Sequence, residues 1–119
     1  NVMVVEHHSH YAMTATAFGN QVLWLPQIEA KIGRDVRARI DASDVSLTTT
    51  RPSNSSIRNI LHMKVVEMIK HDDQVDVKLV NDGNYLWARI TPWARDELNI
   101  QEGQWLYAQI KSISLSRHL

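Results

Sequence analysis

The stretch Gln74-Val75-Asp76-Val77-Lys78-Leu79-Val80-Asn81-Asp82-Gly83-Asn84 decides the fold class of this chain. Its first part alternates apolar with polar residues, which is the period-2 pattern of a strand with one buried face. Its last four residues tolerate positive φ angles, so the chain can reverse there in a tight turn. The next residues, 85–90, are again strand-like. The stretch therefore predicts an antiparallel β-hairpin.

A short helix and a last strand are expected after this hairpin. Thr91 and Pro92 are typical of the N-cap and the first position of a helix, which should end near Leu98. Glu102-Gly103 then predicts a turn, and we expect the last strand at 105–115.

Related segments occur in the same order in both halves of the chain. The first match is Val4-Val5-Glu6 with Val65-Val66-Glu67, and the second is Gly19-Asn20-Gln21-Val22-Leu23-Trp24 with Gly83-Asn84-Tyr85-Leu86-Trp87. In the third, Ala38-Arg39-Ile40 corresponds to Ala108-Gln109-Ile110, and Val45-Ser46-Leu47 corresponds to Ile113-Ser114-Leu115. Such a tandem repeat predicts a degenerate first unit at 1–48, a linker at 49–54 and a second unit at 55–119. We expect a mainly β fold of tandem five-stranded OB-type barrels, each with one short helix.

Charge and cysteine content exclude several classes of function. Thirteen basic and 13 acidic residues give a formal net charge of zero, which argues against a broad nucleic-acid surface. The absence of cysteine excludes disulfides and thiolate chemistry. No apolar run approaches the roughly 20 residues of a membrane span, so we expect no direct membrane insertion and a cytoplasmic location.

Polar and basic residues suited to a small tetrahedral anion gather in the second unit. Ser55-Ser56-Ile57-Arg58-Asn59 offers hydroxyls and a guanidinium, and Lys111-Ser112 adds an ammonium and another hydroxyl. Thr91 opens a helix, whose first backbone N–H groups at Trp93 and Ala94 favour negative charge. The alternative interpretation is that these residues are solvated turns and surface charges.

Histidines and tryptophans suggest two further kinds of site. His7, His8 and His10 could bind zinc or nickel with a third ligand, but such histidines are more often surface or interface residues, and we predict no metal site. Trp24, Trp87, Trp93 and Trp105 could stack on single-stranded nucleic acid. Because Lys and Arg do not cluster between them, we expect these tryptophans in the core or at an interface and no nucleic-acid partner.

No catalytic set is apparent in the sequence. It lacks the P-loop pattern G-x-x-x-x-G-K-[ST], and no serine has a His–carboxylate pair with motif support. We therefore predict a binding module and not an enzyme, with no cofactor.

Several of these motifs resemble a known family. Ser-Ser-Ile-Arg-Asn before a Val-rich strand, and Ala-Gln-Ile-Lys-Ser near the end, resemble the opening and closing strands of Mop (molbindin, also TOBE) domains. The whole chain is similar to the C-terminal domain of the ATP-binding subunit of bacterial molybdate ABC transporters. The resemblance implies paired OB-type domains, a homodimer, and molybdate or tungstate as ligand near subunit interfaces. It also implies an ATPase domain in the parent chain, transporter membrane subunits as partners, and a position at the inner face of the bacterial inner membrane.

The resemblance assigns the oxyanion contacts residue by residue. The matching residues are Ser56, Arg58, Asn59, Thr91, Lys111 and Ser112. Two positions depart from the family: Ala94 stands where some members have a second hydroxyl, and Asp41 stands in the first unit where Lys111 stands in the second. We expect the second unit to supply the ligand site of a regulatory domain. The alternative is a ligand-free dimerisation domain of the same ATPase subunit.

Overall fold

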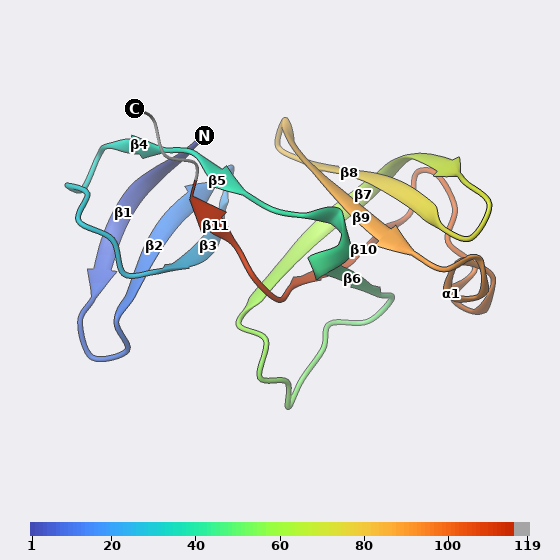
Figure 1. Cartoon of the computed structure of the whole chain (residues 1–119), viewed down its shortest axis with the longest axis horizontal. Helices are drawn as coiled ribbons and strands as arrows, with labels where there is room; N and C mark the ends of the chain where they lie inside the picture. Colours follow the sequence, from blue (N-terminus) through green and yellow to red (C-terminus); the bar gives the residue numbers. More distant parts are fainter. Residues whose placement is uncertain (116–119) are drawn as a thin grey trace. The chain divides into compact units, whose positions relative to one another are not determined.

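The computed structural model of the chain describes residues 1–115, and nearly all its elements are strands (Figure 1). They are β1 (Val2–His8), β2 (Met13–Phe18), β3 (Gln21–Pro26), β4 (Asp35–Val36), β5 (Ala38–Arg39), the 3-10 helix η1 (Ala42–Asp44), β6 (Val45–Thr48), β7 (Asn59–Lys70), β8 (Val75–Asn81), β9 (Asn84–Ile90), α1 (Pro92–Leu98), β10 (Trp105–Ile110) and β11 (Ser114–Leu115). The mainly β fold class is confirmed. Two compact units are present: unit 1 holds residues 1–39 and the segment beginning at Ile113, and unit 2 holds residues 40–112.

Unit 2 is built on a five-stranded antiparallel sheet in the order β6-β10-β7-β8-β9. The predicted hairpin joins β8 to β9, where Asn81 pairs with Asn84. Asp82 and Gly83 form the two-residue turn with φ angles of 51° and 75°. These positive angles suit the right-handed twist of the flanking strands.

The sheet of unit 2 curls round one hydrophobic core. Its edge strand β9 contacts both η1 and the opposite edge strand β6, as expected of a half-barrel. The inward positions of the strands supply the buried side chains Val45, Leu47, Leu61, Met63, Val65, Val75, Val77, Leu79, Leu86, Ala88, Leu106, Ala108 and Ile110. The period-2 pattern of the sequence therefore corresponds to one buried face.

Unit 1 has a four-stranded sheet in the order β3-β2-β1-β4 and a small ladder of β5 with β11. The short helix expected in each unit is found as an α-helix in the second only, because residues 1–48 contain the 3-10 helix η1 and no α-helix. Residues 27–34 connect β3 to β4 instead, and the residue before Pro26 is Leu25, whose side chain has no oxygen to cap a helix start. In unit 2 that cap exists, since the Ala94 N–H donates to Thr91 Oγ1 over 3.0 Å.

The tandem repeat is visible in matching β-bulges. The register of β1 shifts between Val4 and Glu6, and that of β7 shifts between Val65 and Glu67. Val4 exchanges backbone hydrogen bonds of 2.8 Å with the pair 33–34, and Val65 does the same with the pair 103–104. The two halves therefore share a backbone motif despite their different connections.

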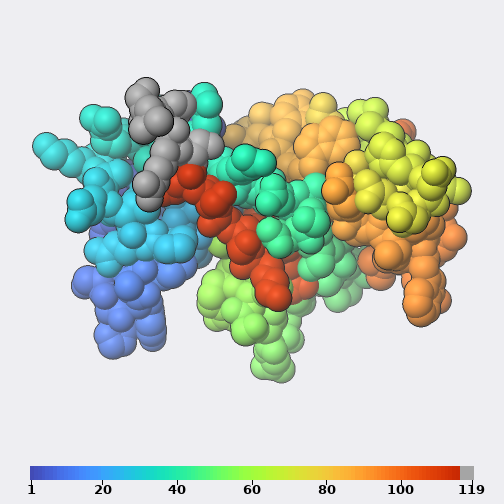
Figure 2. Space-filling model, viewed as in Figure 1, coloured from blue at the N-terminus to red at the C-terminus, as the bar shows by residue number. Residues whose placement is uncertain are grey.

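The compact units nevertheless contain segments of both repeats. Strand β6, from the end of the first repeat, pairs with β10, and β11 from the second pairs with β5. The predicted linker 49–54 belongs to the loop 49–58, which extends away from the sheet of unit 2 (Figures 1 and 2). The division into repeats at 1–48 and 55–119 stays a prediction, and its last four residues lie outside the described part.

The last strand was expected to be continuous over 105–115, and this is wrong. Strand β10 ends at Ile110, and β11 begins at Ser114 in another ladder. The backbone N–H of Lys111 donates to the Asp44 carbonyl oxygen over 2.9 Å instead of continuing the sheet. The segment 111–113 therefore leaves the sheet.

Candidate anion-binding site

The end of β10 brings three segments of the chain together. Ile110, the last residue of β10, pairs on one side with Asn59, the first residue of β7, and on the other with Val45, the first residue of β6. The residues that flank these three positions, just outside the strands, therefore lie at the same end of the three strands. We call this end of the sheet its edge. The flanking residues are Arg58, Lys111 and Asp44.

Arg58 and Lys111 are the two positive charges at this edge, and both are exposed. One guanidinium N–H of Arg58 donates to the Ser55 carbonyl oxygen over 2.5 Å, which ties the side chain to its own turn. Among the ion pairs of residues 1–115, none joins Arg58 or Lys111 to a carboxylate. Two adjacent cations with free donors suit a tetrahedral oxyanion.

The residues before Arg58 form a turn that fixes the start of β7. The Ile57 N–H donates to Ser55 Oγ over 3.1 Å. Ser56 is exposed in this turn, whereas Asn59 is buried with 9% of its surface accessible. The structure therefore brings Ser56, Arg58 and Asn59 to the same edge as Lys111.

Ser112 reaches this edge as well, but its hydroxyl already has an acceptor. Ser112 Oγ donates to Asp44 Oδ2 over 3.2 Å. The sequence analysis missed Asp44, although one signal was available. Asp44 directly precedes Val45-Ser46-Leu47 and Ser112 directly precedes Ile113-Ser114-Leu115, so the two residues hold equivalent places in the repeat.

Thr91 lies away from the other five predicted residues. It follows Ile90, which pairs with Val75, and Val75 pairs with Lys70 at the end of β7, whereas Asn59 begins that strand. Helix α1, which Thr91 caps, and the start of β7 lie at opposite ends of unit 2 (Figure 1). The Ala94 N–H, expected as an anion donor, is used in the cap.

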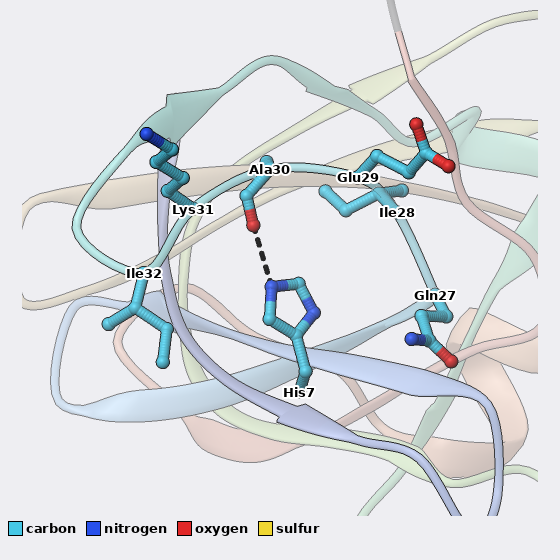
Figure 3. Close-up of a pocket in the computed structure, with 7 residues that line it drawn as sticks. All are labelled: His7, Gln27, Ile28, Glu29, Ala30, Lys31 and Ile32. Atoms are coloured by element: carbon cyan, nitrogen blue, oxygen red, sulfur yellow. Dashed lines mark hydrogen bonds between the residues drawn. The ribbon is translucent and has the colours of Figure 1, made fainter.

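The other polar clusters of the described residues have structural partners. His7 and the loop 27–32 line an open hollow of about 490 Å³ (Figure 3). His7 Nε2 donates to the Ala30 carbonyl oxygen over 2.6 Å, and Nδ1 lies 2.9 Å from Thr14 Oγ1. The Ile28 N–H also donates to Thr14 Oγ1. His7 therefore anchors this loop to the sheet of unit 1.

His8 and His10 both form ring contacts with Tyr11. His8 stacks on Tyr11 with ring centroids 5.3 Å apart, and His10 meets Tyr11 edge-on at 4.6 Å. Within residues 1–115, no three His, Asp or Glu side chains come together as metal ligands.

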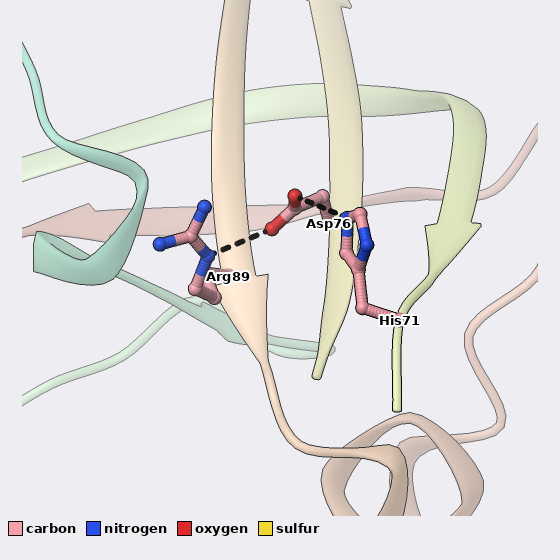
Figure 4. Close-up of polar contacts among 3 residues, drawn as sticks. All are labelled: His71, Asp76 and Arg89. Carbon is pink, nitrogen blue, oxygen red and sulfur yellow. Dashed lines mark hydrogen bonds and ion pairs between the residues drawn. The ribbon is translucent and has the colours of Figure 1, made fainter. Parts of the chain in front are cut away.

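Asp76 forms the best-connected charged cluster of unit 2 (Figure 4). Arg89 Nε donates to Asp76 Oδ1 over 2.9 Å, and His71 Nε2 lies 3.1 Å from Oδ2. The hydrogen bond from Arg89 lowers the pKa of Asp76, with its positive charge and the contact with His71 acting in the same direction. Asp76 in turn raises the pKa of Arg89, which stays positively charged. Because this charge is balanced by the Asp76 carboxylate, Arg89 is a poor ligand for a further anion.

The tryptophans are not core residues, contrary to one of the two expectations. Trp93 is 77% exposed and Trp105 is 47% exposed. Trp24 and Trp87 are half-buried, because each sits at an outward position between buried neighbours of its strand. Lys78 Nζ lies 4.7 Å from the centroid of the Tyr85 ring on the same outer face.

The family follows from comparison with known proteins. Residues 55–116 match the model of the TOBE domain. The chain belongs to the TOBE domain family. The match covers the second repeat, including Arg58 and Lys111.

Similar proteins point to one transport system. Three proteins named molybdenum import ATP-binding protein ModC match: that of Photorhabdus laumondii is 63% identical over 119 residues, that of Yersinia pestis 57% over 116, and that of Escherichia coli 55% over 115. These matches cover 100%, 98% and 97% of the chain but only 34%, 32% and 33% of the relatives. The chain corresponds to the C-terminal part of ModC and spans about a third of its length.

A solved structure has the same fold. It is the cytoplasmic molybdate-binding protein ModG with molybdate bound, with a TM-score of 0.78 over 96% of this chain and 91% of that one. At 22% identity the likeness concerns the fold. No helix among residues 1–115 has the length and apolar character needed to cross a membrane.

Proposed function

We propose that the chain binds molybdate or tungstate as the regulatory domain of a molybdate-import ABC transporter ATPase. The observation that supports this proposal is the place of Arg58 and Lys111 next to the paired residues Asn59 and Ile110, with no ion pair to a carboxylate of residues 1–115 for either. The similarity to ModC proteins supports the transport context, and the molybdate held by the structural neighbour supports the ligand class.

Each residue of the proposed site has a chemical role. The planar guanidinium of Arg58 donates two N–H groups to two oxygens, and the Lys111 ammonium supplies a compact charge. Ser56 and Ser112 donate hydroxyl hydrogens. Asn59, which is buried, fixes the start of β7 and hence the direction of the Arg58 segment.

Thr91 belongs to this site only if a second copy of the chain supplies it. Within one chain it lies at the other end of the ladder formed by β7, β8 and β9. We therefore propose a homodimer in which Thr91 of each copy approaches the Arg58–Lys111 edge of the other. Two equivalent oxyanions per dimer are expected.

The proposed partners of this domain are the ATPase domain of the parent chain and the transporter membrane subunits, at the inner face of the bacterial inner membrane. The chain contains no P-loop, so nucleotide hydrolysis is assigned to the rest of the parent protein. Regulation follows from linkage: an oxyanion that binds one arrangement of the dimer more tightly shifts the population toward it.

A ligand-free dimerisation domain is the second candidate. One observation favours it: the Asp44 carboxylate lies at the proposed site and accepts the Ser112 hydrogen bond. The missing hydroxyl at Ala94 points the same way.

Isothermal titration of the purified chain with molybdate, tungstate and sulfate separates these two functions. Saturable binding of molybdate and tungstate at one oxyanion per chain, which sulfate does not reproduce, is the expected result. A folded dimer that binds none of the three anions would favour the structural role.

A further inference from the structure

We infer that Asp44 competes with the oxyanion for the Ser112 hydroxyl. In the free chain the Asp44 carboxylate accepts the hydrogen bond of Ser112, and this contact lowers the affinity of the site for the oxyanion. This inference rests on the proposed function. It concerns how the site is regulated from within the chain and assigns a role to a residue of the first repeat.

The position of Asp44 follows from the strand register. Asp44 precedes β6 and Lys111 follows β10, whose terminal residues Val45 and Ile110 are paired. Two hydrogen bonds join Asp44 to the departing strand. Its carbonyl oxygen accepts from the Lys111 N–H over 2.9 Å, and its carboxylate accepts from Ser112 Oγ over 3.2 Å.

The two hydrogen bonds have different consequences for a variant. The first involves only the backbone, so it survives any side-chain replacement at Asp44 and continues to hold Lys111 in place. The second depends on the carboxylate. Replacing the side chain therefore removes the competitor without removing the anchor of Lys111.

A serine hydroxyl carries one hydrogen, and this makes the contacts exclusive. While Ser112 donates to Asp44, it cannot donate the same hydrogen to an oxyanion. Binding of the oxyanion through Ser112 therefore requires the hydrogen bond to Asp44 to break. The Asp44 carboxylate oxygen thus accepts the hydrogen bond that an oxygen of the bound oxyanion would accept.

The charge of Asp44 acts in the same direction. A carboxylate next to a dianion repels it, and the repulsion grows as the charges approach and as water is excluded. The oxyanion must overcome both this repulsion and the existing hydrogen bond. Asp44 therefore raises the oxyanion concentration at which the site fills.

The test compares the molybdate Kd of the full chain with those of Asp44→Asn and Asp44→Ala at low ionic strength. Asn keeps a neutral acceptor near Ser112, and Ala removes the acceptor. We expect molybdate to bind about threefold to tenfold more tightly to both variants, with a smaller gain at high salt. Unchanged or weaker binding by both variants would overturn the inference.

Asp73→Asn is the matched control, since it makes the same charge change. Asp73 is exposed in the connection between β7 and β8, beyond the end of β7 opposite to Asn59. The molybdate Kd of Asp73→Asn should equal that of the unmodified chain. Thermal melting of each variant checks that the fold is kept.

A double-mutant cycle with Ser112→Ala tests the exchange of the hydroxyl. If Asp44 acts through Ser112, the gain from Asp44→Asn becomes smaller when Ser112 is absent. An equal gain in both backgrounds would overturn the exchange. If neither the unmodified protein nor any Asp44 variant binds molybdate, this result would instead contradict the proposed function.

Discussion

Ser112 and Asp44 are 68 positions apart in the chain, yet Ser112 Oγ donates a hydrogen bond of 3.2 Å to the Asp44 carboxylate. The contact joins the end of the second repeat to the end of the first. Strand β6, from the first repeat, also joins the two repeats, because it pairs with β10 of the second repeat in one sheet. The proposed site is therefore a product of both repeats, although its cations come from the second.

The first prediction concerns excision of the second repeat. A chain of residues 55–119 lacks η1 and β6, so it loses the buried side chains Val45 and Leu47 and exposes the edge of β10. We expect it to unfold at a lower urea concentration than a chain of residues 40–119. Circular dichroism during urea titration measures the difference, and equal midpoints would show that β6 contributes nothing.

The second prediction concerns the two cations. Arg58→Ala and Lys111→Ala should each weaken molybdate binding at least tenfold, since each removes a charge-assisted hydrogen bond worth about 1.5–3 kcal/mol. Both side chains are exposed, so the melting temperature should change little.

Lys70→Ala is the control for this pair, because Lys70 is an exposed cation at the other end of β7. Titration calorimetry should give it the unmodified affinity. Equal weakening by all three substitutions would indicate general electrostatic attraction and not a site at this edge.

The third prediction concerns acid stability. The pKa of Asp76 in the folded chain lies below its ordinary value of about 3.8, chiefly through the hydrogen bond from Arg89. The folded state therefore binds fewer protons than the unfolded state in this range. The stabilisation is complete above the unfolded pKa and is lost as the pH falls through the folded pKa.

Asp76→Asn should accordingly lower the free energy of unfolding at pH 7 and flatten its decline below about pH 4. Urea unfolding at a series of pH values measures both effects. Asp73→Asn, at an exposed position without such partners, should leave the pH profile as it is. An unaltered profile in Asp76→Asn would contradict the assignment.

The fourth prediction separates the two roles of Thr91. As N-cap of α1, it accepts from the Ala94 N–H, so Thr91→Ala should cost about 1 kcal/mol of stability while Thr91→Ser costs little. If Thr91 also reaches the site of a second copy, Thr91→Ala weakens molybdate binding as well. Normal affinity in the destabilised variant would restrict Thr91 to capping.

Local patterns in the sequence predicted much of unit 2. The alternation of Val75, Val77 and Leu79 gave a strand with one buried face, and Asp82-Gly83 gave the turn. Thr91-Pro92 marked the start of α1 as the structure has it. Each of these depends on neighbours in the chain, which is why a single sequence reveals them.

Long-range features were not predictable in this way. Whether β6 pairs within its own repeat or with β10 depends on competition between distant strands, which no local pattern records. The break after Ile110 depends on the same pairing, because the Lys111 N–H turns to Asp44. The α-helix expected in the first unit is absent because Leu25, which precedes Pro26, cannot cap a helix as Thr91 does before Pro92.

The candidate site was predicted only in part for the same reason. The residues around Arg58 and Lys111 were identified by motif, and the register pairs their neighbours Asn59 and Ile110. Asp44 was overlooked, because its position at the site depends on the pairing of β6 with β10. The separation of Thr91 from the site likewise follows from the length and register of β7.

The most direct test of the central claim is a crystal structure of the chain grown with tungstate, with the tungsten located by its anomalous signal. We expect one peak per chain, within hydrogen-bonding reach of the Arg58 guanidinium and the Lys111 ammonium, with Thr91 of a second copy facing it. A peak elsewhere on the chain, or none in crystals of a chain that stays folded, would contradict it.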